Sequence, residues 1–289
     1  MCSPDLTEIA GLGTVNHVLV ASEGEQKWVI RFERDLLSDE TFEKEAWCME
    51  HAARAGIPVA AVVAHGELEG RPYLIQEFVP GKAGTELRSE SLWRTLGEYA
   101  FRIHAIATPS TAPRSLFQRF DLDPEACWIA HLKYNLEQLV PEDPLIELNV
   151  YGKGVRGEIV AVFERLASHK HRFGLNHGDL ALRNLIVPAD GPPVLIDWGC
   201  ATAGPIPYGD LQPVYAEHLR AGDPNNEEFD AFAEGYGLDL EKELPVLRDL
   251  ALLGRIDLVR WAIDRRPDRL QEIVNASREY VNRYLEQDH

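Results

Sequence analysis

The chain has 289 residues, of which 45% are hydrophobic and 26% are charged, a composition typical of an ordinary globular protein with one large domain or two lobes. Asp and Glu exceed Lys and Arg by 47 − 29 = 18, which argues against a nucleic-acid partner; it would attract a cationic small molecule, or simply keep the protein soluble. No apolar run reaches the length of a membrane span and residues 1–5 lack the features of a signal peptide, so we expect no membrane partner and a cytoplasmic location.

Short strands dominate the predicted amino-terminal part. Apolar alternation at residues 15–21 and 27–32, with turn formers at 22–25, predicts a β-hairpin. Ahead of it, the glycines of residues 11–16 could place backbone N–H groups over phosphates. The run is not a complete phosphate-binding motif, and glycine turns of this kind are often only turns.

A helix and two further strands complete this part. Ser38 or Asp39 could cap a helix that runs to about Ala55 and ends at Gly56. Strands are then predicted near residues 59–64 and 73–78, with a turn over 66–72.

Helical periodicity dominates the chain from about residue 89 onward. Apolar residues recur at three and four residue steps from Leu92 to Ile106, which predicts a helix with one buried face. Residues 109–153 are less regular, and a helix is expected over 155–173. Further helices are expected around residues 229–236, 244–263 and 270–285.

The residues that suggest a reaction lie between the helix expected over 155–173 and the helices expected from residue 229 onward. Residues 185–187 and 194–196 are short apolar runs separated by turn formers, which indicates a β-hairpin. Asn184 precedes its first strand and Asp197 follows its second, so both should lie at its open end, with Cα atoms roughly 5 Å apart. An amide oxygen and a carboxylate are ligands that Mg²⁺ takes together with nucleotide phosphates and water. Asp179, five residues before Asn184, could accept or orient a hydroxyl proton.

These residues fall in two motifs with a known pattern: His177-Gly178-Asp179-Leu180-Ala181-Leu182-Arg183-Asn184 and Ile196-Asp197-Trp198-Gly199. The pair resembles the aminoglycoside phosphotransferase and choline kinase group, small-molecule relatives of the protein kinases, whose own signatures are H-R-D-x-x-x-x-N and D-F-G. Gly178 in place of the kinase Arg and Trp198 in place of the Phe favour the small-molecule branch.

The resemblance implies a fold and a division of the chain. The expected fold class is α+β: a two-lobed protein-kinase-like fold with a small amino-terminal antiparallel sheet and one helix, and a larger, mainly helical carboxy-terminal lobe. Residues 1–80 would form the nucleotide-binding lobe, ending in the hinge, and residues 81–289 the lobe with the catalytic loop and acceptor site.

The resemblance also implies nucleotide-binding residues. Arg31 falls where kinases carry their phosphate-contacting Lys, with Lys27 as the competing cation. Glu45 matches the helix glutamate that would pair with Arg31, although Glu43 and Glu50 compete for that role. In the family, backbone atoms of the hinge read adenine, which maps to Glu77 and Val79 here.

Three residues of the larger lobe are also matched by position. Arg183 would either neutralise the transferred phosphoryl group or merely pair with a nearby acid. His104 is expected to be a packed structural histidine. Asp210 is expected to cap the helix that follows it and to brace the catalytic loop.

The implied activity is transfer of the γ-phosphate of ATP (or GTP), with Mg²⁺, to a hydroxyl of a small-molecule acceptor, which could be cationic. An antibiotic such as an aminoglycoside or macrolide is the first candidate, and a choline-, ethanolamine- or sugar-type metabolic kinase is the alternative. A catalytically inactive nucleotide-binding pseudokinase is a further alternative. The sequence indicates neither the acceptor residues nor the oligomeric state.

Overall fold

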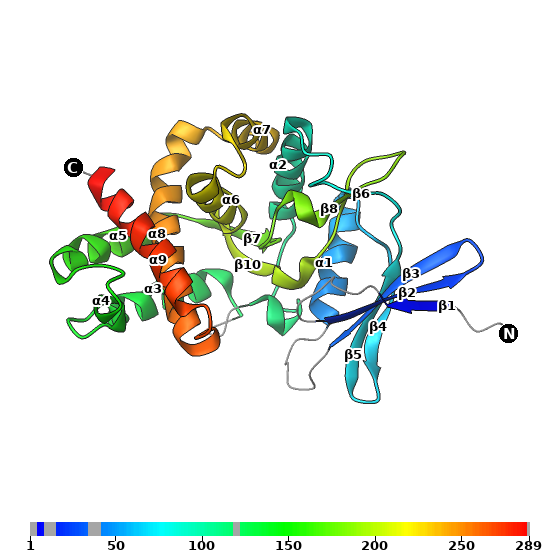
Figure 1. Cartoon of the computed structure of the whole chain (residues 1–289), viewed down its shortest axis with the longest axis horizontal. Coiled ribbons are helices and arrows are strands. Elements are labelled where there is room, and N and C mark those ends of the chain that lie inside the picture. Colours follow the sequence, from blue (N-terminus) through cyan, green and yellow to red (C-terminus); the bar gives the residue numbers. More distant parts are fainter. Residues whose placement is uncertain (1–4, 9–15, 34–41, 118–121, 288–289) are drawn as a thin grey trace.

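The computed structural model describes residues 5–8, 16–33, 42–117 and 122–287. A five-stranded antiparallel sheet lies at one end and a larger helical part at the other (Figure 1). The strand order in the sheet is β1-β2-β3-β5-β4. These strands are β1 (Asp5–Glu8), β2 (Asn16–Glu23), β3 (Gln26–Glu33), β4 (Val62–Leu68) and β5 (Arg71–Glu77). This arrangement confirms the predicted small amino-terminal sheet.

One helix, α1 (Glu43–Arg54), accompanies the sheet and lies between it and the helical part (Figure 1). Its buried apolar side chains, Ala46, Cys48, Met49 and Ala52, follow helical spacing. The helix ends where Gly56 takes a left-handed φ of 76°, as predicted. The predicted caps Ser38 and Asp39 and the glycine run of residues 11–15 lie outside the described residues.

The second hairpin of the sheet is tighter than predicted. Strands β4 and β5 are joined at Glu69 and Gly70, whose φ angles are both positive, 52° and 77°. Two positive φ values in a two-residue loop are typical of a turn whose twist matches that of the strands. The turn therefore lies within the predicted span of residues 66–72 but takes only two of them, because both strands continue into that span.

The helical part is built mainly from long helices. Within the described residues, no helix is both long and apolar enough to cross a bilayer. Its helices are α2 (Glu90–His104), α3 (Pro124–Gln138), α4 (Pro144–Glu147), α5 (Arg156–Ser168), α6 (Tyr208–Ala221), α7 (Asn226–Tyr236), α8 (Leu240–Arg265) and α9 (Leu270–Gln287). Its short strands are β6 (Lys82–Ala83), β7 (Arg172–Asn176), β8 (Leu185–Val187), β9 (Val194–Leu195) and β10 (Thr202–Ile206).

Helices α2 and α7 pack closely against each other. The predicted inward face is confirmed, because all six of its residues are buried: Leu92, Leu96, Tyr99, Ala100, Ile103 and Ile106. A Cβ built on Gly97 would lie 2.0 Å from the Phe232 carbonyl oxygen, and one on Gly235 would lie 2.0 Å from that of Arg94. The glycines therefore allow the two backbones to approach each other directly.

The helix predicted over residues 155–173 is shorter and is followed by a strand. Helix α5 ends at Ser168, and residues 172–176 form β7, which pairs antiparallel with β10. The pairing partner lies far along the chain, so local periodicity could not reveal it. Strand β7 leads directly into His177 and fixes where the predicted catalytic loop begins.

His171, just before β7, makes folding stability depend on pH. Burial beside the rings of Trp128, Phe173 and Tyr208, together with the charge of His169, lowers its pKa from 6.5 to about 4. The unfolded chain therefore binds a proton between these values that the folded protein does not. We expect the free energy of unfolding to fall as the pH is lowered from 6.5 to about 4. The loss should be about 1–2 kcal/mol, because the ring is only half-buried.

Urea denaturation across this pH range would measure the loss, with His171→Gln as the matched variant. The difference in stability between the two proteins isolates this residue from other titrating groups. An identical pH dependence in both proteins would contradict the prediction.

Candidate active site

The predicted hairpin is present as β8 and β9. Leu185 pairs with Leu195, and the Ile196 N–H donates to the Asn184 carbonyl oxygen at 2.9 Å. Asn184 therefore lies opposite Ile196, and Asp197 follows one residue beyond this pair. Asp197 has a left-handed backbone, with a φ of 64°, which is uncommon for a residue with a side chain and turns the chain sharply at this point.

The loop before the hairpin folds back onto Asp179. The Asn184 Nδ2 donates to the Asp179 backbone oxygen at 2.8 Å and to its Oδ2 at 2.9 Å. Arg183 donates to the other carboxylate oxygen of Asp179. Because the amide nitrogen of Asn184 faces Asp179, its carbonyl oxygen points the other way and could serve as a ligand.

Asp210 braces this loop from inside the larger part. Its buried carboxylate accepts from the backbone N–H groups of His177 at 2.9 Å and Gly178 at 2.6 Å, and from His104 Nε2 at 3.0 Å. The predicted brace and the packed histidine are thus confirmed. The predicted helix cap was wrong: Asp210 is the third residue of α6, and Pro207 holds the N-cap position.

Gly178 is required by this close packing. Its φ is 80°, and a Cβ built on it would lie 2.2 Å from the Cys200 carbonyl oxygen. An arginine, which protein kinases carry here, would not fit this backbone.

His177 joins the loop to the hairpin. Its Nδ1 accepts from the Asp179 N–H at 3.3 Å, so the proton is assigned to Nε2, which donates to the Ile196 carbonyl at 3.1 Å. Burial lowers the pKa of His177 and keeps the ring neutral. Its ring lies 4.7 Å from that of the fully buried Trp198. The two sequence motifs therefore form one packed unit.

Arg31 on β3 contacts Glu45 on α1 through two hydrogen bonds, Nη1 to Oε2 at 2.5 Å and Nη2 to Oε1 at 3.2 Å. Burial raises the pKa of Glu45, and the Arg31 guanidinium opposes that shift. Arg31 Nη2 also lies 4.0 Å from Asp197 Oδ1. The sheet and the hairpin motif therefore meet at Arg31.

The residues that were alternatives to Glu45 and Arg31 do not take part in this ion pair. Glu43 and Glu50 are exposed, and Glu50 pairs with Arg54 at 3.4 Å. Lys27 is exposed and lies over the Phe78 ring, 5.8 Å from its centroid.

Lys44 also belongs to this cluster, although the sequence did not indicate it. This buried side chain extends from α1 and donates through Nζ to the Gly199 carbonyl oxygen at 2.6 Å. It ties the helix that carries Glu45 to the segment after Asp197. The local sequence could not have predicted this contact, because Lys44 and Gly199 are 155 positions apart in the chain.

Glu77 and Val79 flank the connection between the two parts of the chain. Glu77 is exposed at the end of β5, and the half-buried Val79 precedes β6. Base recognition by their backbone atoms stays a prediction.

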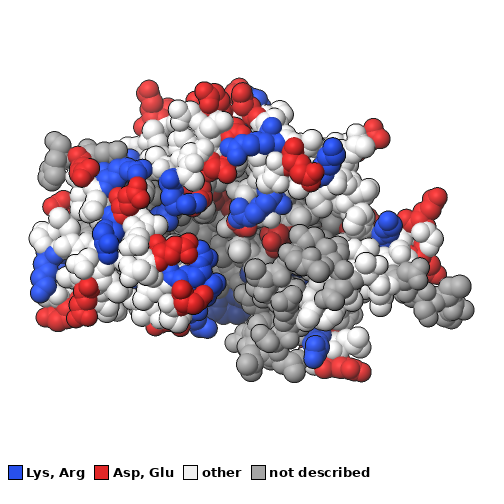
Figure 2. All heavy atoms as spheres, viewed as in Figure 1, with Lys and Arg blue, Asp and Glu red and all other residues white. Residues whose placement is uncertain are grey.

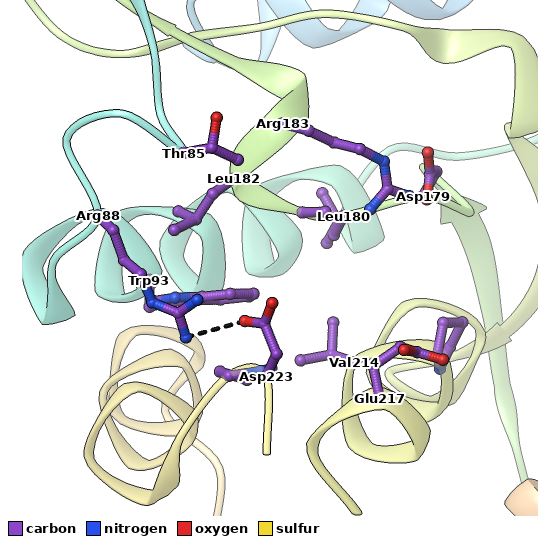
Figure 3. Close-up of a pocket in the computed structure, with 13 residues that line it drawn as sticks. Thr85, Arg88, Trp93, Asp179, Leu180, Leu182, Arg183, Val214, Glu217 and Asp223 are labelled. Carbon is purple, nitrogen blue, oxygen red and sulfur yellow. Dashed lines mark hydrogen bonds and ion pairs between the residues drawn. The ribbon is translucent and has the colours of Figure 1, made fainter. Parts of the chain in front are cut away.

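A pocket of about 230 Å³ opens beside Asp179 (Figure 3). Its lining comes from α2 and the segment before it, the catalytic loop and the region from α6 to α7, and none of the described residues between 109 and 153 contributes to it. The lining residues are Thr85, Arg88, Trp93, Asp179, Leu180, Ala181, Leu182, Arg183, Pro213, Val214, Glu217, Asp223 and Pro224.

The donor set around the hairpin suits a nucleotide-bound cation better than an all-protein metal site. Across the described residues, no group of three or more His, Cys, Asp and Glu side chains could hold a metal ion. Asn184 and Asp197 would supply two oxygen ligands, which fits Mg²⁺ completed by phosphates and water.

Comparison with known proteins places the chain in a family. The model of the phosphotransferase enzyme family matches residues 5–250, whereas no curated protein matches this sequence significantly.

Several solved structures resemble the fold at 16% sequence identity. A putative fructosamine-3-kinase from Haemophilus somnus 129PT has a TM-score of 0.65, over 98% of this chain and 92% of that one. A thermostable mutant of aminoglycoside phosphotransferase APH(4)-Ia has a TM-score of 0.64, over 96% of this chain and 94% of that one. Spectinomycin phosphotransferase, in complex with ADP and spectinomycin, has a TM-score of 0.59, over 95% and 88%. These likenesses confirm the predicted kinase-like fold, and the family match over most of the chain shows that this protein belongs to the phosphotransferase enzyme family.

Proposed function

We propose that this phosphotransferase transfers the γ-phosphate of ATP (or GTP) to a hydroxyl group of a small molecule. One observation carries the proposal: Asp179 and Asn184 are joined by hydrogen bonds of 2.8 and 2.9 Å, beside Asp197, which Arg31 approaches to 4.0 Å. A candidate base, two candidate metal ligands and a phosphate-binding cation thus lie in one cluster. The nucleotide complexes of the similar structures, with ADP or AMP-PNP, support this proposal.

In the proposed reaction, the acceptor oxygen bonds to the γ-phosphorus as the bond from that phosphorus to the bridging oxygen of the nucleotide breaks. Asp179 orients the acceptor hydroxyl and takes its proton. Arg31, held by Glu45, contacts the α and β phosphates. Mg²⁺, when held by Asn184 and Asp197, would neutralise charge on the phosphates.

Among the described residues, Arg183 forms an ion pair with Asp179. Its exposed guanidinium could turn from that carboxylate to the transferred phosphoryl group, so both roles predicted for it stay open. The position beside Asp179 supports either role.

We also infer that residues 1–80 form the nucleotide lobe and residues 81–289 the acceptor lobe. The last strand of the sheet ends at Glu77, and β6 already pairs with β8 of the larger part. Glu77 and Val79 would then contact the base through backbone atoms. The cytoplasmic location stays a prediction from the sequence.

Two acceptor classes are compatible with this reaction. An aminoglycoside or macrolide antibiotic is supported by the likeness to antibiotic phosphotransferases. A sugar-type acceptor is supported by the likeness to a putative fructosamine kinase.

The test is transfer of labelled phosphate from ATP, and in parallel from GTP, to a panel of antibiotics, choline, ethanolamine and sugars. We expect a product heavier by one phosphoryl group, formed with Mg²⁺ and abolished by EDTA. Nucleotide binding without any phosphorylated acceptor would favour the inactive pseudokinase instead.

A further inference from the structure

The pocket beside Asp179 has a second polar end. Figure 3 shows Asp179 and Arg183 on one side of it and Arg88 and Asp223 on the other. Arg88 Nη2 lies 2.9 Å from Asp223 Oδ1. A molecule that fills the pocket would therefore contact the candidate base at one end and this ion pair at the other.

We propose that this pocket binds the acceptor and that the Arg88–Asp223 pair selects a neutral, polyhydroxylated molecule over a polycation. This inference rests on the proposed function, because it names the acceptor class of the same site.

Four of the five charged side chains in the pocket lining are paired with one another. Its lining holds three carboxylates, on Asp179, Glu217 and Asp223, and two guanidinium groups, on Arg88 and Arg183. Arg183 contacts Asp179 and Arg88 contacts Asp223. A polycation would have to displace these arginines, whereas hydroxyl groups can accept from a guanidinium and donate to a carboxylate at the same time.

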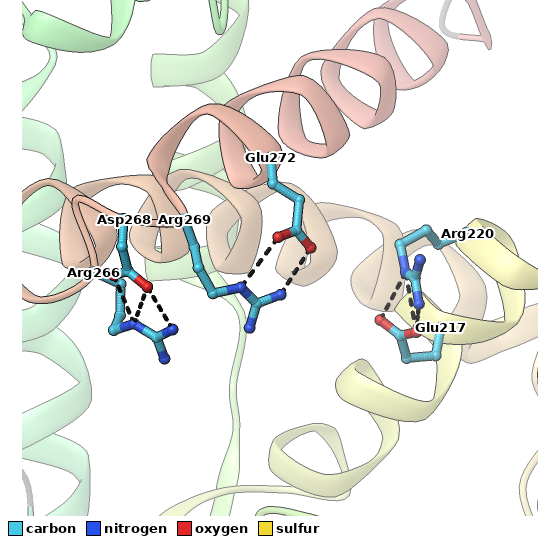
Figure 4. A network of polar contacts seen from close by, with 6 residues as sticks. All are labelled: Glu217, Arg220, Arg266, Asp268, Arg269 and Glu272. Atoms are coloured by element: carbon cyan, nitrogen blue, oxygen red, sulfur yellow. Dashed lines mark hydrogen bonds and ion pairs between the residues drawn. The ribbon is translucent and has the colours of Figure 1, made fainter. Parts of the chain in front are cut away.

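The remaining carboxylate, Glu217, is paired outside the pocket. Figure 4 shows it facing Arg220 on the same helix, and Arg220 Nε donates to Glu217 Oε1 at 3.1 Å. Arg255 is a second basic neighbour, with its Nη2 4.0 Å from Glu217 Oε1. Glu217 therefore adds little uncompensated negative charge to the pocket.

Arg88 is held firmly in place. Its Nε donates to the buried Glu228 Oε1 at 2.6 Å, in addition to the contact with Asp223. These hydrogen bonds raise the pKa of Arg88, so it stays charged. A fixed guanidinium with planar donors suits neighbouring hydroxyl groups on a ring.

Size and apolar surface fit the same class of molecule. About 230 Å³ is below the roughly 300–1,000 Å³ of pockets for drug-sized ligands and suits a single sugar ring. Trp93, Leu180 and Val214 supply apolar surface for the C–H face of such a ring. The face shown in Figure 2 intersperses acidic with basic side chains, so the net charge of −18 does not produce a uniformly acidic surface there.

The decisive variant is Asp223→Asn, because this carboxylate is mostly exposed and the Arg88–Glu228 pair stays intact. The probes are the neutral sugars D-ribose, D-fructose and D-glucose, together with choline and the polycation kanamycin. We expect a neutral sugar to be phosphorylated. Asp223→Asn should raise the KM for that sugar at least tenfold and leave the KM for ATP within twofold. Arg88→Lys should act in the same direction, since it loses the planar donors.

The matched control is Arg94→Gln. Arg94 pairs with Glu234 at 2.5 Å and joins α2 to α7, but it lies outside the pocket lining. It should leave both KM values within twofold. Phosphorylation of kanamycin or choline in preference to every neutral sugar would overturn the proposal, as would a sugar KM insensitive to Asp223→Asn.

Binding measured without turnover separates this proposal from the proposed function. Saturation-transfer NMR of the same sugars reports pocket binding even if no phosphate is transferred. Sugar binding weakened by Asp223→Asn, without transfer, would support the pocket and contradict the proposed reaction. Transfer to an acceptor regardless of Asp223 would support the proposed reaction and contradict the pocket proposal. The pocket proposal would also be overturned if no sugar bound and no sugar was phosphorylated.

Discussion

Replacing Asp179 by Asn is expected to lower kcat for phosphate transfer by about 10²- to 10⁴-fold, the range typical of a lost general base. The amide keeps the size of the side chain and can still accept a hydrogen bond from Arg183 or Asn184. It cannot take the proton of the acceptor hydroxyl. The KM for ATP should change little, since Arg31 and Glu45 are untouched.

Stability separates this catalytic effect from a structural one. The Asp179–Arg183 pair is partly exposed, so its loss should cost no more than about 1 kcal/mol of unfolding free energy. Asp190→Asn, at an exposed position in the turn between β8 and β9, is the matched control and should retain full activity. A kcat for Asp179→Asn within threefold of the wild type would refute the assignment of the base.

The sequence could predict the active-site motifs because they depend on short-range geometry. Asn184 and Asp197 are brought together by one hairpin whose strands and turn are contiguous in the chain. We expected Asn184 and Asp197 to lie across from each other at the open end of the hairpin. The observed register differs by one residue, because Asn184 lies opposite Ile196. The helices with strong periodicity, such as α2, were predictable for the same local reason.

The features that escaped prediction depend on residues far apart in the chain. Strand β7 exists because β10 pairs with it, and neither is long enough to be recognised alone. Arg88 and Glu228 are separated by 140 positions. The pocket beside Asp179 therefore depends on how the catalytic loop packs against α2, α6 and the segment after α6, and a sequence motif marks only the side formed by the loop.

Asp210 should be as important for activity as the candidate base Asp179. We expect it to act by stabilising the fold around the catalytic loop and not by taking part in the reaction. Replacing it by Ala would leave the N–H groups of His177 and Gly178 and the Nε2 of His104 without their buried acceptor. Removing one partner from such a buried charged network typically costs about 3–5 kcal/mol. We expect a loss of unfolding free energy in that range, measurable by urea denaturation.

The charge of Asp210 is itself stabilised by this arrangement. Burial alone would raise the pKa of Asp210, but hydrogen bonds from the His104 side chain and the His177 backbone hold that pKa below its usual value. Asp210→Asn keeps the shape but turns an N–H₂ donor toward groups that donate. It should therefore also be destabilising, although less than the alanine variant.

Activity distinguishes the positioning role of Asp210 from general stability. Because its carboxylate holds the two residues that precede Asp179, a folded Asp210→Asn variant should lose kcat at temperatures well below its unfolding transition. Asp230→Ala, at an exposed position on α7, should change stability by no more than about 0.5 kcal/mol. If Asp210→Ala were equally mild, the catalytic loop would have to be held by contacts other than this buried carboxylate.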